Sequence, residues 1–335
     1  MPNTAPDPTQ ETAVAVGVIY NARGEVLVTR RHAHQHQGDL WELPGGKVEP
    51  GEDVSQALRR ELLEELGLVV DQARPLIEIP WSYPDKTVRL QTWRVNAWHA
   101  EAGHDFSAPS GVGREEQAWR WQTPSSLDPK QFPAANRSLL RAAQLPSRFL
   151  ITGRAQDFDQ WLQRLQAAYA RGIRWVQIRW PQEWSEISQT QLKERFDLLR
   201  ALYPQTASDP LRVIWNGDLE VAASLPVDGV HLNRHALLES TQRPRFPWVS
   251  ASCHNPEELH QAAQLGVDFA WLSPVLPTQS HPEAKGLGWE TFAHWVREAQ
   301  LPVYALGGVA EAELERAQAA GAQGVAAISA WWKVD

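Results

Sequence analysis

Residues 46–68 read GKVEPGEDVSQALRRELLEELGL, and this stretch decides the fold of the first part of the chain. Apolar residues at helical spacing follow Asp53 and predict a helix over residues 54–66. The spacing of Asp53 and Gln56 predicts a capping box at its start, and Gly67 is placed to end it in a left-handed conformation. The boundaries of this helix are therefore set by neighbouring residues.

The predicted helix has two chemically different faces. Its apolar face, which we expect to anchor it, carries leucines at i, i+4 spacing: Leu58, Leu62 and Leu66. Its acidic face carries three glutamates at i, i+3 and i+4: Glu61, Glu64 and Glu65. An acidic helix face alone is more often a solvated surface. Here a glycine-containing loop precedes the helix, and Arg60 lies one turn ahead of Glu64. Together these features favour a site for Mg²⁺, which prefers oxygen ligands.

The pattern G-x5-E-x7-R-E-U-x-E-E-x-G-U, in which U is apolar, is filled at every position between Gly46 and Leu68. The chain is thereby identified as a member of the Nudix hydrolases. The resemblance implies an α/β/α sandwich with a mixed sheet, and cleavage of a nucleoside triphosphate or similar diphosphate with Mg²⁺, or alternatively Mn²⁺. Glu61 is then the expected general base and Arg60 its orienting residue, and the expected metal ligands are Gly45, Glu61, Glu64 and Glu65.

Outside this pattern, residues 13–143 resemble the MutT branch, which hydrolyses 8-oxo-dGTP to 8-oxo-dGMP and pyrophosphate. Residues 28–31 (VTRR), 41–47 (WELPGGK) and 132–136 (FPAAN) carry the resemblance. It implies that Arg31 and His36 contact phosphate, that Asn136 hydrogen-bonds the oxidised guanine, and that the nucleotide pocket is lined by Glu42, Leu43, Pro44 and Gly45. An N-cap of the following helix is the alternative role for Asn136.

One position departs from the MutT pattern. Relatives of that branch can supply a further Glu just ahead of a late Trp, whereas here Arg120 precedes Trp121. Glu115 and Glu116 are the candidates to replace that carboxylate.

The 335 residues suit two domains, which we place at 12–144 and 148–335, with Leu145–Ser147 as a linker. In the first, we expect strands at 13–20, 25–30, 76–79, 87–99 and 119–122 and a closing helix at 138–144. In the second, strand-like runs alternate with helical stretches and predict a (β/α)8 TIM barrel. The eight runs are 149–152, 175–179, 212–216, 229–232, 248–252, 269–273, 302–306 and 324–329.

The second domain resembles the thiamine phosphate synthase and TenI family. The shared stretches are VQIR at 176–179, DGVHL at 228–232, SPVLPT at 273–278 and GGV at 307–309. By position, the resemblance implies a ligand site made by Gln177, Arg179, Asn216, Gly307 and Gly308. A Gly-Gly turn leading into a helix suits a phosphate, here with Ser329, and the alternative is that these glycines serve only a tight barrel turn.

Three departures indicate a degenerate synthase. The family's Mg²⁺-binding Asp after Asn216 is Gly217, the Lys after its Pro-Thr stretch is replaced by His281, and the Lys expected after Arg179 is missing. Losing these charged residues weakens the electrostatic stabilisation of the negative charge that develops when pyrophosphate is displaced. The alternatives are a thiamine phosphate synthase whose Nudix half clears thiamine diphosphate analogues, and a module that only binds a phosphorylated thiamine precursor.

Other residues offer weaker signals. His254 and His281 are candidate acid or base groups, and Cys253 is expected to be a buried strand-end residue. The net charge of −8 and the lack of a basic run argue against polymeric nucleic acid as a partner. A single cysteine, with no secretory leader and no apolar run of 18 residues, predicts a cytoplasmic protein without a membrane span.

Overall fold

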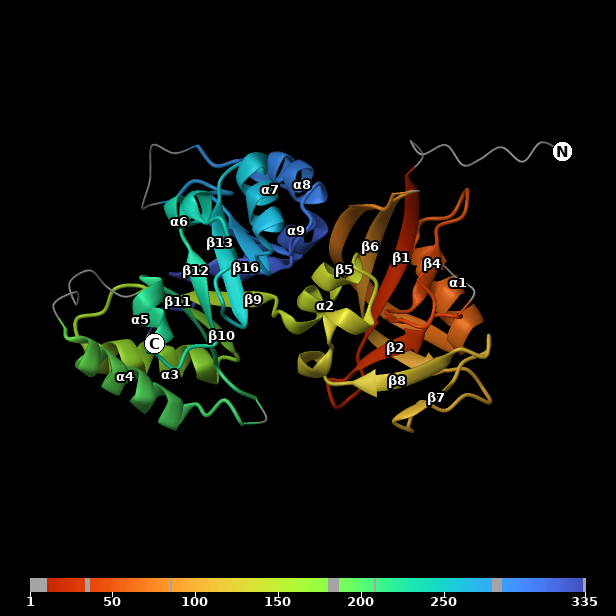
Figure 1. Cartoon of the computed structure of the whole chain (residues 1–335), viewed down its shortest axis with the longest axis horizontal. Helices are drawn as coiled ribbons and strands as arrows, with labels where there is room; N and C mark the ends of the chain where they lie inside the picture. Colours follow the sequence, from red (N-terminus) through yellow and green to blue (C-terminus); the bar gives the residue numbers. More distant parts are fainter. Residues whose placement is uncertain are drawn as a thin grey trace. The chain divides into compact units, whose positions relative to one another are not determined.

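The computed structural model describes residues 11–33, 37–84, 86–179, 187–207, 209–278 and 285–333 (Figure 1). The chain divides into two compact units. One holds the residues up to Leu145 with Arg297–Pro302, and the other holds Pro146–Val296 with the residues from Val303 onward. Each unit is described by itself.

The first unit contains two four-stranded sheets. The mixed sheet has the order β4 (Gly45–Lys47), β1 (Thr12–Ile19), β6 (Thr87–Ala100), β5 (Leu68–Ser82), with β1 and β6 parallel and the other pairs antiparallel. The second sheet is antiparallel throughout, in the order β3 (Trp41–Glu42), β2 (Val26–Arg30), β8 (Ala118–Gln122), β7 (Ser110–Val112).

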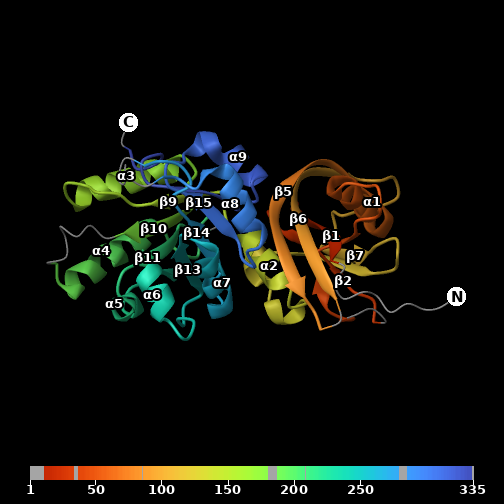
Figure 2. The same cartoon turned by 90° about the horizontal axis from the view of Figure 1, so that it is seen from above.

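Two helices cover opposite sides of the mixed sheet, α1 (Val54–Leu66) and α2 (Asn136–Gln144), as Figure 2 shows. The three leucines of the predicted apolar face of α1 are at most 1% exposed, in a core with Ala15 and Leu27. Leu139 and Leu140 of α2 lie in the other core with Val16 and Val18. Two short 3-10 turns, η1 (Pro124–Ser126) and η2 (Pro129–Gln131), precede α2. The predicted sandwich with a mixed sheet is confirmed.

The second unit is a closed barrel of eight parallel strands, in the order β10-β11-β12-β13-β14-β15-β16-β9. The strands are β9 (Arg148–Ile151), β10 (Trp175–Arg179), β11 (Arg212–Asn216), β12 (Gly229–Leu232), β13 (Trp248–Cys253), β14 (Phe269–Leu272), β15 (Val303–Leu306) and β16 (Gly324–Ala327). All eight predicted runs fall on these strands, so the barrel prediction is confirmed.

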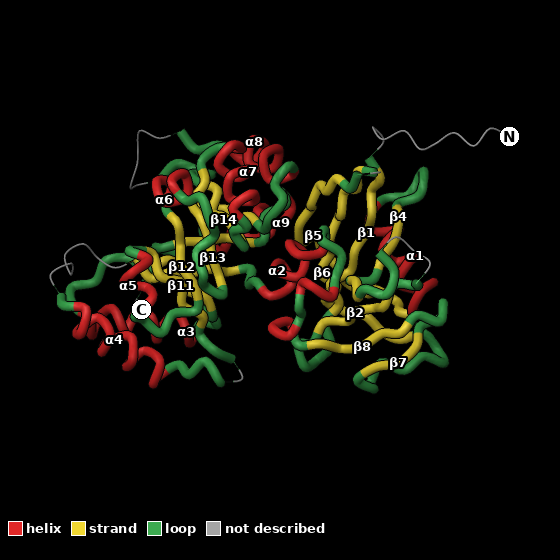
Figure 3. Tube along the Cα trace, in the orientation of Figure 1, coloured by secondary structure: helices red, strands yellow, loops and turns green. Residues whose placement is uncertain are grey.

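Helices lie outside the barrel strands, as the tube in Figure 3 shows. They are α3 (Phe158–Ala170), α4 (Gln189–Leu202), α5 (Leu219–Ala223), α6 (Arg234–Glu239), α7 (Pro256–Leu265), α8 (Gly288–Arg297) and α9 (Leu314–Ala319), with a 3-10 turn η4 (Glu311–Glu313) before α9. Among the described residues, no helix has both the length and the apolar character needed to cross a bilayer.

Candidate functional site

The acidic face of α1 meets the glycine loop at Gly46. This residue pairs with Ala15 of β1, so its backbone is fixed in the mixed sheet. A Cβ atom added at Gly46 would lie 2.1 Å from Cδ and 2.2 Å from Oε1 of Glu61. The carboxylate of Glu61 therefore packs directly on the backbone of the loop, and a side chain at position 46 would displace that carboxylate.

Arg60 connects the loop to the carboxylates. Its guanidinium donates to Oε1 of Glu61 (2.9 Å) and to Oε2 of Glu64 (3.1 Å), the i,i+4 pair that the sequence predicts. It also donates to Oε1 of Glu52 (2.7 Å) and to the carbonyl of Lys47 (3.0 Å). The role of Glu52 was missed in the sequence, although it occupies a fixed position of the pattern. Arg60 thus holds two of the predicted ligands in place from one side.

Glu65 lies in a negative environment. Burial, together with the charges of Glu42, Glu61 and Glu115, raises its pKa to about 8. Its Oε2 is buried without a hydrogen-bond partner. Burial also raises the pKa of Glu61, which the hydrogen bond from Arg60 opposes. Because a buried carboxylate oxygen without a partner is costly, the site fits a cation that is not part of the protein.

Glu115 lies close enough to the acidic face of α1 for its charge to act on the carboxylates there. Its charge raises the pKa of both Glu61 and Glu65. The preceding residue, Arg114, fixes this segment to the end of α1 by donating its backbone N–H to the carbonyl of Glu65 (2.7 Å). Arg120 turns elsewhere: its guanidinium stacks 3.8 Å from the centre of the Trp41 ring. Of the two predicted substitutes, Glu115 is the one that acts on the cluster.

The carboxylates of the acidic face of α1 do not form a complete set of metal ligands by themselves. Among the described residues, no three His, Cys, Asp or Glu side chains stand in a metal-ligating arrangement. Mg²⁺ usually keeps several waters and takes few protein carboxylates. The residues present fit such a hydrated ion, with Glu64 and Glu65 as the side chains to hold it.

The segment from Glu42 to Gly45 runs between the two cores of the unit. Glu42 forms a tight ion pair with Arg31, and burial raises its pKa to about 7 against the lowering effect of that arginine. Leu43 is 3% exposed and belongs to the core on the α2 side, and the carbonyl of Pro44 accepts from Gly17 (2.8 Å). Gly45 has φ +145°, and a Cβ there would lie 2.1 Å from the Ala15 carbonyl oxygen.

Asn136 is the first residue of α2 and is half-buried. The N-cap is Ala135, with no side-chain cap, so the N-cap alternative for Asn136 is wrong. The preceding residue, Ala135, belongs to the same buried core as Leu43 of the predicted pocket segment. Of the two predicted phosphate contacts, Arg31 lies beside this segment through Glu42, and His36 lies outside the described residues.

In the barrel, two predicted ligand residues lie side by side. Arg179 and Asn216 are register partners at the carboxyl ends of β10 and β11, the face on which barrel sites form. Gln177 is only 3% exposed, and its Oε1 accepts the indole N–H of Trp271 (2.8 Å). The side chain of Gln177 is therefore already engaged inside the barrel.

The glycines of the barrel are placed by packing. A Cβ at Gly217 would lie 2.8 Å from the indole of Trp215, so the ring fills the space beside the position of the family's Asp. Gly307 and Gly308 have φ of +90° and +68°, and a Cβ on either would lie within 3 Å of the loop at Pro274–Pro277. A tight turn thus accounts for both glycines, whether or not a phosphate binds there. Ser329 follows β16 and is exposed.

The remaining candidate residues of the barrel are a buried cysteine and a histidine that contacts a buried glutamate. Cys253 is buried, as expected, and burial raises the pKa of its thiol. His254 contacts Oε2 of Glu258 through Nδ1 (2.9 Å), and Arg234 donates to Oε1 of the same buried carboxylate (2.6 Å). Burial favours a higher pKa for Glu258, but these hydrogen bonds outweigh it and the pKa is lowered. His281 lies outside the described residues.

Comparison with known proteins gives each unit a family. The Nudix domain model matches residues 10–143, and the thiamine monophosphate synthase model matches residues 148–331. An 8-oxo-dGTP diphosphatase of Escherichia coli is 34% identical over 38% of this chain and 92% of its own. A putative thiamine-phosphate synthase 2 of Aquifex aeolicus is 31% identical over 56% of this chain and 97% of its own.

One solved structure is similar to the first unit. It comes from a study of MutT from Aliivibrio salmonicida and Vibrio cholerae and is 30% identical. It covers 40% of this chain and 97% of its own, with a TM-score of 0.33.

Proposed function

Because the chain belongs to the Nudix family in its first unit and to the thiamine monophosphate synthase family in its second, we propose that the first unit hydrolyses 8-oxo-dGTP to 8-oxo-dGMP and pyrophosphate with Mg²⁺. The packing of the Glu61 carboxylate on Gly46 carries the proposal, because it joins the acidic helix to the loop of the nucleotide pocket. The similarity to 8-oxo-dGTP diphosphatases supports the substrate.

The proposed reaction is the addition of water to a phosphorus of the α–β anhydride and the breaking of that P–O bond. A bound Mg²⁺ would supply charge for the phosphate oxygens and lower the pKa of its water. Glu64 and Glu65, with the carbonyl of Gly45, are the groups proposed to hold the ion. Glu61 accepts the proton of the attacking water at its carboxylate, and Arg60 keeps that carboxylate in position.

The proposed base contact is Asn136, whose amide offers a donor and an acceptor to the edge of an oxidised guanine. Its position beside the core that contains Leu43 supports this role. A site built on paired hydrogen bonds rejects a base that lacks the matching groups. Discrimination between 8-oxo-dGTP and dGTP therefore depends on Asn136.

The first test is a pyrophosphate-release screen of the full chain with Mg²⁺ over 8-oxo-dGTP, the ordinary dNTPs, nucleotide sugars and thiamine diphosphate analogues. We expect 8-oxo-dGTP to have the highest kcat/KM and Glu61→Gln to abolish turnover. Asn136→Ala is expected to reduce the preference for 8-oxo-dGTP over dGTP by about tenfold or more. The exposed neighbour Arg137→Ala is the matched control, and a preference unchanged in Asn136→Ala contradicts the assignment.

For the barrel, we propose binding of a phosphorylated thiamine precursor without synthesis. The indole of Trp215 beside Gly217 supports this, because it occupies the neighbourhood of the missing Asp. The full chain is incubated with the aminopyrimidine diphosphate and the thiazole phosphate. Thermal stabilisation without product supports the binding role, whereas formation of thiamine phosphate establishes the synthase alternative. We further propose that the protein works in the cytoplasm on small phosphate compounds.

A further inference from the structure

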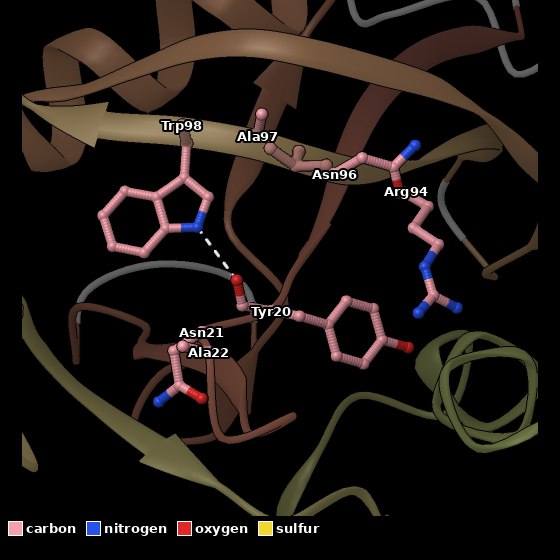
Figure 4. Close-up of a pocket in the computed structure, with 8 residues that line it drawn as sticks. Tyr20, Asn21, Ala22, Arg94, Asn96, Ala97 and Trp98 are labelled. Atoms are coloured by element: carbon pink, nitrogen blue, oxygen red, sulfur yellow. Dashed lines mark hydrogen bonds between the residues drawn. The ribbon is translucent and has the colours of Figure 1, made fainter.

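A cavity of about 400 Å³ lies in the first unit away from the acidic helix. Its walls are Tyr20–Ala22, at the end of β1, and Arg94–Trp98 of β6 (Figure 4). Neighbouring residues of β1 point to opposite faces of the sheet. Gly17 faces Leu58 and Leu62 of α1, whereas Val18, the register partner of Arg94, packs in the core on the α2 side. The side chain of Arg94 is therefore on the face opposite the carboxylates of α1.

Two arginines oppose each other on neighbouring strands, and one of them, Arg94, lines this cavity. Arg94 of β6 is the register partner of Arg74 on β5, an antiparallel pair. Like charges placed directly opposite in a sheet are destabilising. The charge of Arg94 and the partial burial of Arg74 both lower the pKa of Arg74, with burial the larger cause. Among the described residues, neither guanidinium forms an ion pair, and Nη1 of Arg74 is buried without a hydrogen-bond partner.

The surrounding groups hold Arg94 in place without neutralising it. Its guanidinium lies over the Tyr20 ring, 4.2 Å from the ring centre, as Figure 4 shows. The Tyr20 hydroxyl donates to the carbonyl of Ala143 (2.6 Å), and Trp98 donates its indole N–H to the Tyr20 carbonyl (2.9 Å). The pocket wall is therefore fixed by hydrogen bonds that do not use the guanidinium.

Other arginines of the chain show how such charges are usually compensated. Arg60 contacts three carboxylates, Arg200 pairs with Asp228 at 2.5 Å, and Arg243 pairs with Asp268 at 2.6 Å. A buried donor without an acceptor and a close like-charge pair each cost free energy. At Arg74 and Arg94 the protein itself supplies no compensating charge among the described residues.

We propose that this cavity is a binding site for the phosphate group of a small molecule, separate from the hydrolase site. Guanidinium groups bind phosphate through paired N–H donors, and two adjacent cations match a phosphate monoester that carries nearly two negative charges at pH 7. Tyr20 also lines the cavity, whereas the ring of Trp98 packs on Trp121 and contributes only the indole N–H that fixes the Tyr20 carbonyl. A phosphate group bound at Arg94 brings negative charge next to the Arg74–Arg94 pair and offsets the repulsion between the two arginines.

The direct test is arginine modification by phenylglyoxal on the full chain without Mg²⁺, followed residue by residue by mass spectrometry of peptides. Inorganic phosphate is the probe, against chloride and acetate at equal ionic strength. At a phosphate concentration about ten times its dissociation constant, Arg94 is expected to react about tenfold more slowly. The exposed Arg23 and Arg137 are internal controls whose rates stay unchanged. An equal rate for Arg94 in phosphate and chloride, or equal protection by acetate, overturns the proposal.

Variants give an independent measurement. Arg74→Gln removes the like-charge pair but keeps Arg94, so its unfolding temperature without phosphate is expected to equal or exceed that of the parent. The gain in unfolding temperature on adding phosphate is expected to shrink in Arg74→Gln and in Arg94→Gln, and to persist in Arg23→Gln. Phosphate bound elsewhere contributes equally to all of these proteins. A full phosphate-dependent gain in both pocket variants shows that the anion binds somewhere else.

Discussion

The carboxylate of Glu61 occupies the space that a Cβ atom on Gly46 would fill, with Cδ of Glu61 only 2.1 Å from that position. The two residues come from different elements, β4 and α1, and the pairing of β4 with β1 prevents Gly46 from moving aside. The position of the proposed general base therefore depends on the lack of a side chain in the loop. This contact yields a prediction about catalysis that is separate from the chemistry of Glu61 itself.

We expect Gly46→Ala to lower kcat by about 10²-fold, because the added methyl group displaces the Glu61 carboxylate by an ångström or more. The measurement is pyrophosphate release at saturating substrate and Mg²⁺. Gly103→Ala is the control: Gly103 has φ +94° and open space around it, so alanine there strains an exposed turn without displacing a neighbouring side chain. That variant should lose some stability and keep its kcat. Normal turnover by Gly46→Ala contradicts the positioning of Glu61 by the loop.

A second prediction concerns Arg60, whose guanidinium contacts Glu52, Glu61 and Glu64 at once. Lysine keeps the charge but is a single point donor, so it cannot reproduce this fork of contacts. Arg60→Lys should lower kcat by about 10²-fold with little change in the KM for the nucleotide.

Arg59→Lys is the matched control for Arg60, because Arg59 is exposed on the same helix and donates to the carbonyl of Val70. A change in KM alone for Arg60→Lys indicates that Arg60 binds substrate rather than positioning the carboxylates.

The sequence predicted helix α1 residue for residue because Asp53, Gln56 and Gly67 set its ends through local contacts. The same holds for β10, β11 and β12, which are short apolar runs buried on both sides. By contrast, β5 extends over residues 68–82 rather than 76–79, since its charged residues and Pro75 do not read as a strand. The two-residue β3 and the glycine strand β4 exist only through pairing with their neighbours.

In the candidate site, too, contacts between residues close in sequence were predictable, and contacts between distant segments were not. The pairing of Arg60 with Glu64 was predictable because the two residues are one helical turn apart. Arg31 forms an ion pair with Glu42, and no local sequence pattern predicts it. The charges of Glu42 and Glu115 raise the pKa of Glu65 from other segments of the chain, which a local pattern does not predict either. Sequence therefore predicted the chemical groups of the candidate site but not the neighbouring residues that shift their pKa values.

A third prediction tests why the barrel lacks the family's Asp. Gly217→Asp should destabilise the barrel by about 1–3 kcal/mol, because its Cβ would lie 2.8 Å from the indole of Trp215. Gly217→Ala should show a smaller loss of the same sign. In a Trp215→Leu background the cost of Gly217→Asp should fall, and a double-mutant cycle measures this coupling. Equal unfolding temperatures for the parent and Gly217→Asp contradict the steric explanation.

A fourth prediction concerns the buried polar network of the barrel. His231 is 4% exposed, and its Nδ1 shares the indole N–H of Trp271 (3.0 Å) with Gln177 and lies 2.9 Å from Oγ of Ser250. Its Nε2 lies 2.8 Å from Oγ of Ser252. A ring that accepts at Nδ1 is neutral with its proton on Nε2, which donates to Ser252. Complete burial lowers the pKa of His231 to about 3. The folded barrel therefore keeps this histidine neutral throughout the ordinary pH range.

The unfolded chain binds a proton at His231 below about pH 6.5, whereas the folded barrel does so only near pH 3. The stabilisation from the neutral ring is therefore present above pH 6.5 and is lost as the pH falls toward 3. Between pH 7 and pH 5, the parent should lose about 2 kcal/mol more of its unfolding free energy than His231→Gln. Denaturant unfolding at both pH values measures the free energy of unfolding, taken from the unfolding transition whose midpoint changes in His231→Gln. His235→Gln, an exposed histidine of α6, is the matched control and should keep the pH dependence of the parent. If His231→Gln retains that full dependence as well, the proton uptake on unfolding comes from other groups.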